Sequence, residues 1–214
     1  MTDGLTTRDR RLVALSCAGA AGTPERIEDA VAAALAQDVS AVELREAVLH
    51  LAVYIGWPRG AMVNQAVEAA LKAALVAVPE QGAGLPLPGA ADPAERIAGG
   101  EAMFREVNAL PYAPGTTLPY TGAGVTAFVF GEVWDRPDLA RRDRRLLSLP
   151  AAAYVGAWTP IVSHVYGALK SGDLSDAAMD ELVDEFGQHA GAEKAKLLAD
   201  VVADQRSAIA AERT

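Results

Sequence analysis

The chain has 214 residues, of which 51% are hydrophobic, and a formal net charge of −9 at pH 7. This length fits one compact domain or two small, closely packed ones with a sizeable core. The acidic balance argues against binding to nucleic acid or to anionic membranes, because both need clustered Lys and Arg.

Cysteine content and the chain start set further bounds. The single cysteine, Cys17, allows neither an internal disulfide nor a CxxC redox pair, and it is most simply a small core residue. The polar first residues lack a signal-peptide pattern, and no apolar run reaches the roughly 18 residues of a membrane-spanning helix. We expect a reduced, cytoplasmic protein.

Helical periodicity covers almost the whole chain, whereas β-branched residues are sparse and no run alternates with a period of two. Thr23 and Pro24 are favourable residues for a helix start, and Ser40 with Glu43 forms a capping box. The first helices are expected at about 6–18, 24–38, 40–54 and 57–76.

Residues 78–93 hold four of the twelve prolines and are predicted to be a linker. Beyond it we expect a helix at about 94–108, a turn-rich stretch and an apolar helix at about 125–134. Four more helices follow, near 140–155, 160–171, 176–189 and 191–211. The sequence therefore predicts an all-α fold.

One sequence run occurs twice. Leu5-Thr-Thr-Arg8-Asp9-Arg10-Arg11-Leu12 returns as Leu139-Ala-Arg-Arg142-Asp143-Arg144-Arg145-Leu146, at a constant offset of 134 residues (139 minus 5). After a one-residue insertion, Glu46 corresponds to Glu181. We interpret this register as a tandem duplication of one helical unit and expect the copies to be related by a pseudo-twofold axis.

The duplication suggests domain limits. The first repeat would span residues 1–77, the linker 78–93, and a second, diverged repeat 94–214. A unit that cannot bury its apolar face alone buries it against its twin, and clefts form where two halves meet. The repeated Arg-Asp-Arg-Arg run is expected to be helix-surface charge paired with a neighbouring acid; gripping a carboxylated ligand is the alternative.

The helix at 40–54 carries Glu46, His50 and Tyr54 as a polar stripe opposite its apolar face. Glu46 precedes His50 by four residues, which allows an acid/base pair in which the carboxylate favours the imidazolium form. A solvated face with an incidental ion pair is the alternative. Tyr54 and Trp57 continue the stripe as large aromatics, which favours a pocket or a subunit contact.

His164 falls at the edge of the apolar stripe of the helix at 160–171. It is either a hydrogen-bonded histidine at a core boundary or a general acid/base or substrate-orienting group. Its counterpart in the first repeat is Ala30, so its role occurs once per chain. His189 follows Glu185 by four residues and is interpreted as part of a surface pair. The histidines lack metal-ligand spacing, so no metal site is expected.

The run Glu43-Leu-Arg-Glu46-Ala-Val-Leu-His50-Leu-Ala-Val-Tyr54-Ile-Gly56-Trp57-Pro58 resembles the signature of the carboxymuconolactone decarboxylase family, within the alkylhydroperoxidase-D-like superfamily. Segments starting at Phe130 and His164 are similar to the same family. The resemblance implies an all-helical bundle, here duplicated, that assembles into trimers or hexamers. By analogy it implies decarboxylation of a carboxymuconolactone without metal or organic cofactor. The superfamily's thiol peroxidase chemistry is not expected, because it needs a CxxC.

The two repeats keep different parts of the family pattern. The family histidine of the second helix is Ala30 in the first repeat and His164 in the second, whereas the Glu/His/Tyr-Gly-Trp-Pro run is intact only in the first. We therefore expect one composite site that faces a shared cavity. Its catalytic residues would be His164, His50 and Glu46, and its substrate-binding residues Tyr54, Trp57 and Trp134.

The expected function is that of a cofactor-independent enzyme acting on a small carboxylated or lactone-like organic acid. Histidines would transfer the proton and an Arg would stabilise developing negative charge. The alternatives are an isomerase or cyclase that uses the same pocket on another small metabolite, and a non-catalytic oligomeric pseudo-enzyme. Aromatic residues on polar faces, at Tyr54, Trp57 and Trp134, also predict a homo-oligomer.

Overall fold

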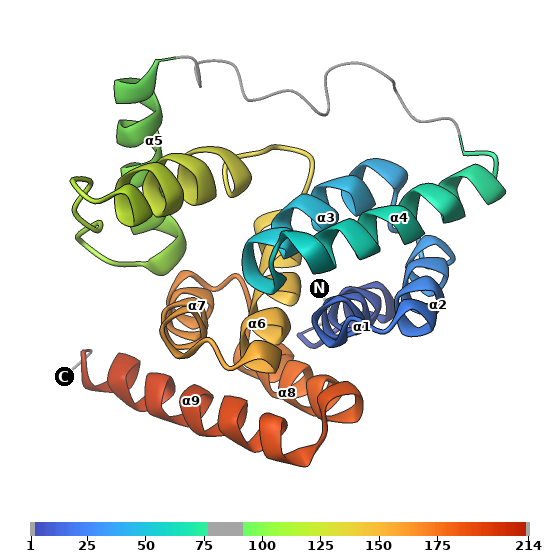
Figure 1. Cartoon of the computed structure of the whole chain (residues 1–214). Helices are drawn as coiled ribbons and strands as arrows, with labels where there is room; N and C mark the ends of the chain where they lie inside the picture. Colours follow the sequence, from blue (N-terminus) through green and yellow to red (C-terminus); the bar gives the residue numbers. More distant parts are fainter. Residues whose placement is uncertain (1–2, 77–91, 213–214) are drawn as a thin grey trace.

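The computed structural model describes residues 3–76 and 92–212, and all regular structure within these ranges is helical. The all-α prediction is therefore confirmed. The helices, labelled in Figure 1 except for η1, are α1 (Thr7–Ala21), α2 (Pro24–Leu35), α3 (Ala41–Ile55), α4 (Trp57–Ala73), α5 (Pro93–Asn108), η1 (Tyr120–Val133), α6 (Arg141–Val155), α7 (Trp158–Ser171), α8 (Asp176–Ala190) and α9 (Ala192–Ala211).

Local sequence signals explain the helix ends that frame the site. The predicted capping box at Ser40 and Glu43 begins α3, and each side chain bonds the other residue's backbone N–H. Gly56 ends α3 with φ +84°, in a region where a side chain would be strained, and α4 starts at the next residue. The sharp turn after Gly56 therefore sets the direction in which α4 leaves α3.

The helix starts follow the sequence repeat. Helices α1 and α2 begin at residues 7 and 24, and α6 and α7 begin at residues 141 and 158, with the offset of 134 (141 minus 7, 158 minus 24). Helices α3 and α4 start 135 residues before α8 and α9 (176 minus 41, 192 minus 57), after the predicted insertion. Both halves thus have the same helix order. The pseudo-twofold superposition stays a prediction.

Helices α1 and α6 form the centre of the molecule. They pack against each other, α1 also contacts α8, and α6 also contacts α3 (Figure 1). Arg8 donates to both carboxylate oxygens of Asp143, at 3.0 and 2.9 Å, and Arg142 donates to Asp9 at 3.0 Å. The two repeated runs therefore exchange ion pairs across this contact, because the first arginine of each Arg-Asp-Arg-Arg run bonds the aspartate of the other.

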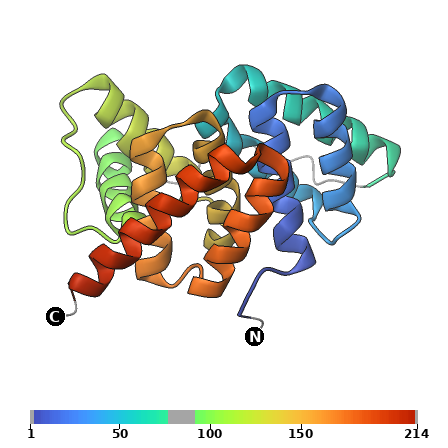
Figure 2. The same cartoon turned by 90° about the horizontal axis from the view of Figure 1, so that it is seen from below.

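Helices α5 and η1 form an additional pair that packs on α7 beside the main bundle (Figure 2). The two helices approach closely at glycines: a Cβ on Gly100 would lie 2.0 Å from the Thr126 carbonyl oxygen, and one on Gly131 would lie 2.7 Å from that of Arg96. A smaller apolar cluster of Val107, Phe130 and Trp134 lies here. The pair carries Trp134 to the edge of the bundle.

The connecting segments differ in part from expectation. The predicted apolar α-helix at 125–134 starts earlier, at Tyr120, and is a π-helix, an uncommon wide form. Of the predicted linker, 78–93, only Asp92 and Pro93 lie in the described residues. They begin α5, where the Asp92 carboxylate accepts from the Ala94 N–H at 2.8 Å. Among the described residues no helix combines the length and apolar character needed to cross a membrane.

Candidate functional site

Four aromatic side chains from three parts of the chain meet between α3, α7 and the end of η1. The ring of Trp134 lies 4.9 Å from that of His50 and 5.4 Å from that of His164, between ring centroids. The ring of Tyr54 lies 5.3 Å from His50 and 5.5 Å from His164. We call these four residues the histidine cluster. Of the six residues proposed from sequence, it contains four.

The Tyr54 hydroxyl is the centre of the hydrogen bonds in the histidine cluster. Trp134 Nε1 donates to it at 3.0 Å, and His164 Nε2 lies 2.9 Å from it. Tyr54 is partly buried, whereas Trp134 and both histidines are buried. The exposed part of the Tyr54 side chain is therefore the part of the cluster nearest to solvent, while desolvation by burial raises the pKa of its hydroxyl.

Each histidine has one arginine at its Nδ1. Arg144 Nη1 lies 3.3 Å from His50 Nδ1, and Arg145 Nη1 lies 3.2 Å from His164 Nδ1. Both arginines are buried, with 1% and 0% of their surface exposed. The expectation that the whole second Arg-Asp-Arg-Arg run is surface charge is therefore wrong for these two residues.

Further contacts fix Arg145. Its Nε donates to Asp173 at 3.0 Å, its Nη2 donates to the Val107 carbonyl, and its guanidinium lies 5.1 Å from the Trp134 ring centre. A Cβ on Gly167 would lie 2.3 Å from that carbonyl oxygen and 3.1 Å from Arg145 Nη2. The absence of a side chain at Gly167 thus leaves room for Arg145.

Glu46 is buried at the other end of the site. Both its oxygens accept from Arg136 Nε at 2.8 Å, and Arg144 Nη2 lies 4.0 Å away. Arg136 also bonds Glu132 at 3.1 Å. The predicted acid/base pair of Glu46 with His50 is wrong, because the carboxylate is directed to arginines and His50 is directed to Arg144.

Burial and the arginines set the protonation of the cluster. Desolvation, the Arg144 charge and His164 lower the pKa of His50 well below 6.5, and desolvation with Arg145 does the same to the pKa of His164. The expected imidazolium form is therefore replaced by neutral imidazole. Desolvation raises the pKa of Tyr54, so the hydroxyl keeps its proton, and lowers that of Arg144 to about 10, so the guanidinium stays charged.

Two polar atoms near the cluster are buried without a hydrogen-bond partner in the described part of the chain. They are Nε2 of His50 and Oγ of Ser148. A buried unsatisfied polar group costs about 1–3 kcal/mol, so native proteins rarely keep one without a reason. Both atoms therefore mark positions where a further polar group could bind.

Trp57 lies outside the histidine cluster. Its side chain is 61% exposed at the start of α4, and its ring lies 6.1 Å from that of Phe128. The sequence placed it with the site because it follows Gly56 in the family-like run, but the turn at Gly56 directs α4 away. The substrate-binding role expected for Trp57 stays a prediction.

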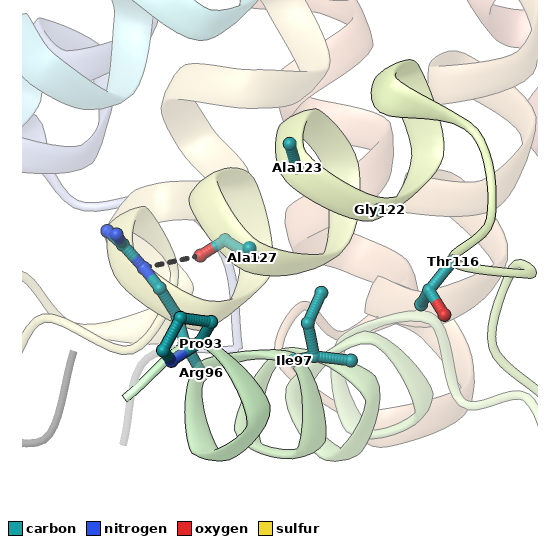
Figure 3. Close-up of a pocket in the computed structure, with 7 residues that line it drawn as sticks. All are labelled: Pro93, Arg96, Ile97, Thr116, Gly122, Ala123 and Ala127. Atoms are coloured by element: carbon teal, nitrogen blue, oxygen red, sulfur yellow. Dashed lines mark hydrogen bonds between the residues drawn. The ribbon is translucent and has the colours of Figure 1, made fainter. Parts of the chain in front are cut away.

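Two cavities lie elsewhere. One of about 340 Å³ lies between α5 and η1, where Arg96 Nε donates to the Ala127 carbonyl at 3.1 Å (Figure 3). Its lining is small and mostly apolar: Pro93, Arg96, Ile97, Thr116, Gly122, Ala123 and Ala127. The other, of about 570 Å³, lies at the turn between α8 and α9. No residue of the histidine cluster lines either of them.

Sequence reasoning missed several residues of the site. Arg136, Arg144, Arg145 and Asp173 were not assigned to it by number, although Arg144 and Arg145 lie in the repeated run. One available signal was the run Leu146-Leu147-Ser148-Leu149, directly after the arginines, which is fully buried. A helix so apolar on several faces buries neighbouring charges as well.

Comparison with known proteins identifies part of the chain. Residues 1–75 match the model of the carboxymuconolactone decarboxylase family, and no curated protein matches the chain. The matched part contains α1 to α4, with Glu46, His50 and Tyr54, whereas Trp134 and His164 lie beyond it. Residues 1–75 of the chain are therefore similar to the carboxymuconolactone decarboxylase family.

Proposed function

We propose that this protein is a cofactor-independent enzyme that binds a small carboxylated or lactone-like organic acid at the histidine cluster. The observation that carries the proposal is His50 Nε2, a buried polar atom with no partner in the described residues. A ligand oxygen placed there would satisfy it and remove the cost of its burial. The partly exposed Tyr54 gives the side from which such a ligand would enter.

The charges around the cluster favour an anion. Arg144 and Arg145 are buried, and their Nη1 atoms lie 3.3 and 3.2 Å from the Nδ1 atoms of the two cluster histidines. Because these arginines are buried, their charges are screened less than at the surface and attract a carboxylate more strongly.

The same features suit a decarboxylation. The bond between the ring carbon and the carboxyl group breaks, carbon dioxide leaves, and the electron pair moves to the lactone carbonyl oxygen to give an enolate. Hydrogen-bond donors and the buried arginines would stabilise this oxyanion. A proton then bonds to carbon as the carbonyl re-forms, and we propose that the histidines mediate this transfer.

We further propose that the protein is a homo-oligomer, of trimer or hexamer type as in the family resemblance. Exposed aromatic side chains support it, since Trp57 and Trp158 are 61% and 56% exposed. Tyr54 and Trp134 no longer contribute to this argument, because they pack within the chain. Sedimentation velocity should give a particle larger than the 22.3 kDa monomer, and a monomer at micromolar concentration would contradict it.

The enzymatic proposal is tested with carboxymuconolactone as substrate. Carbon dioxide release and the product mass are followed for the wild type, His50→Ala and His164→Ala, with His189→Ala as the matched control, since His189 lies outside the cluster and pairs with Glu185. Loss of acid/base groups typically costs about 10²–10⁴-fold in rate, so both cluster variants should fall by at least about 100-fold and the control should not.

Other outcomes identify the alternatives. A product of unchanged mass would indicate an isomerase or cyclase. Saturable binding of the lactone without turnover would indicate a non-catalytic protein. Equal turnover in wild type and both cluster variants would contradict a role for the histidines.

A further inference from the structure

The contacts between arginine and histidine fix the position of each imidazole proton. Arginine has five N–H donors and no acceptor. When Arg144 Nη1 lies 3.3 Å from His50 Nδ1, and Arg145 Nη1 lies 3.2 Å from His164 Nδ1, each Nδ1 must be the acceptor. Each Nδ1 therefore carries a lone pair, and the single proton of each ring is on Nε2.

This assignment sets the direction of the next hydrogen bond. His164 Nε2–H donates to the Tyr54 oxygen at 2.9 Å, and Trp134 Nε1–H donates to the same oxygen at 3.0 Å. The Tyr54 oxygen accepts two hydrogen bonds and has no remaining capacity to accept. Its own O–H proton must then be directed away from both donors.

One imidazole donor is left without an acceptor in the described part of the chain. It is His50 Nε2–H, which is fully buried and borders Trp134 by ring contact. The Tyr54 O–H has the Ser148 hydroxyl beside it, and a polar interaction with the Ser148 side chain acts on the pKa of Tyr54.

We propose that Arg144 and Arg145 are positioning residues that hold His50 and His164 as neutral Nε2–H tautomers, so that His50 Nε2–H is free to bind one negatively polarised oxygen of the ligand. The ligand part of this inference rests on the proposed function, whereas the tautomers do not. In this arrangement the histidines act as hydrogen-bond donors to an oxyanion, and neither removes a proton from the substrate as a base.

The counterpart of this site in the sequence repeat supports the assignment. Arg10 occupies the position of Arg144, and Glu185 occupies that of His50. Arg10 donates to Glu185 at 3.1 Å, so the residue at this position accepts from the arginine in both halves. Only a histidine can accept at one atom and still offer an N–H donor at another.

The tautomers are tested on the intact protein by NMR with nitrogen-15-labelled histidine. Couplings between ring nitrogens and carbon-bound protons distinguish Nε2–H, Nδ1–H and doubly protonated rings. We expect His50 and His164 to be Nε2–H tautomers at pH 7, with His189 as an internal reference next to Glu185. An Nδ1–H or doubly protonated ring at His50 or His164 would overturn the inference.

Variants test the roles of the arginines. In Arg144→Met the His50 signals should move to a mixture of tautomers while those of His164 stay, and Arg145→Met should do the reverse. Arg144→Lys keeps a donor and should restore the wild-type His50 pattern. Arg10→Met is the matched control and should change neither ring. A wild-type pattern in Arg144→Met would overturn the positioning role, and the wild-type spectrum decides the tautomers even if a variant does not fold.

The ligand arm uses acetate, an anion, and γ-butyrolactone, a neutral carbonyl compound. We expect acetate to shift the His50 Nε2–H resonance saturably, and the shift to be smaller in Arg144→Met, in which the Nε2–H tautomer is only partly populated. No shift with either probe would overturn the ligand contact of His50. A saturable shift of the His50 Nε2–H resonance in a protein that does not turn over carboxymuconolactone would contradict the enzymatic proposal and support this inference.

Discussion

Arg144 and Arg10 occupy the same position of the sequence repeat and have opposite surroundings. Arg144 is buried and contacts His50 at 3.3 Å, with Glu46 only at 4.0 Å. Arg10 is partly exposed and pairs with two carboxylates, Glu181 at 2.5 Å and Glu185 at 3.1 Å. We call the contact of Arg10 with α8 the ion-paired counterpart. There the two carboxylates neutralise the charge of Arg10, whereas the histidine cluster does not neutralise the charge of Arg144.

The neighbouring arginines show the same contrast. Arg145 bonds His164, Asp173 and the Val107 carbonyl. Arg11, its counterpart, has a buried Nε without a hydrogen-bond partner in the described residues. At the position of His164 the first half has Ala30, which offers no acceptor side chain.

The difference shows that a site depends on burial by other helices as well as on residue type. The α5 and η1 pair supplies the Val107 carbonyl and leads directly to Trp134. Both of these groups contact Arg145. Burial weakens solvent screening, so the same guanidinium that makes a surface ion pair on one side polarises imidazoles on the other. Variants made in parallel on both sides can therefore sharpen or break this comparison.

The largest expected difference concerns Glu46 and Glu181. Glu46→Gln removes a carboxylate shared by two buried arginines, which should lower the free energy of unfolding by about 3–5 kcal/mol. Glu181→Gln breaks a pair whose side chains are 36% and 39% exposed, and should cost about 0–1 kcal/mol. Urea denaturation followed by circular dichroism measures both. Equal losses of unfolding free energy in Glu46→Gln and Glu181→Gln would show that the two ion pairs do not differ in burial.

Tyr54→Phe tests the hydrogen bonds of the cluster. It leaves the Trp134 and His164 donors without an acceptor, so the free energy of unfolding should fall by about 1–3 kcal/mol. The control is Tyr166→Phe, which removes an exposed hydroxyl bonded to Glu212 and should cost less than about 0.5 kcal/mol. A Tyr54→Phe protein as stable as wild type would mean that these donors find other partners.

Stability should also depend on pH through the cluster histidines. Their folded pKa values lie below the value of 6.5 of a free histidine, so below about pH 6.5 the unfolded chain binds protons that the folded chain does not. The stabilisation is complete above this pH and is lost as the pH falls, by roughly 1 kcal/mol per pH unit for each histidine.

Denaturation at about pH 7.5, 6.5 and 5.5 measures this slope. His50→Gln should reduce this slope by the contribution of one histidine. A free energy of unfolding that is constant over this range would contradict the neutral, buried state of the two histidines.

The smallest expected effect is that of Ser148→Ala. Ser148 has a buried hydroxyl without a partner in the described residues, and its counterpart in the repeat is Ala14. Removing an unsatisfied hydroxyl without creating a large cavity should raise the free energy of unfolding by up to about 1 kcal/mol. If stability falls instead by more than about 1 kcal/mol, the hydroxyl has a partner such as bound water.

Local sequence signals predicted the helices well. The Ser40–Glu43 capping box depends only on neighbouring residues, and it begins α3 as expected. The sequence register also indicated that His50 and His164 would come together, and both rings lie within 5.5 Å of the Tyr54 and Trp134 rings. This expectation used two complementary halves of a repeated pattern, which contain long-range information, and the shared catalytic site stays a prediction.

The remaining features depend on contacts between distant residues. Glu46 was paired with His50 because they are four residues apart on one helix, but its partner, Arg136, is 90 residues away. The burial of Arg144 and Arg145 requires packing that periodicity does not encode. The π-helical form of η1 is equally hidden, since apolar residues in a run fit either helix type.

The exchanged ion pairs between α1 and α6 resemble the contact that two identical subunits make across a twofold axis. Arg8 with Asp143 and Arg142 with Asp9 are reciprocal contacts, but both members belong to one polypeptide. Covalent connection makes this association intramolecular, so its extent depends on an effective concentration and not on the amount of protein. Dilution should therefore leave the central helix pair intact, and each half can change its own side chains without having to match an identical copy.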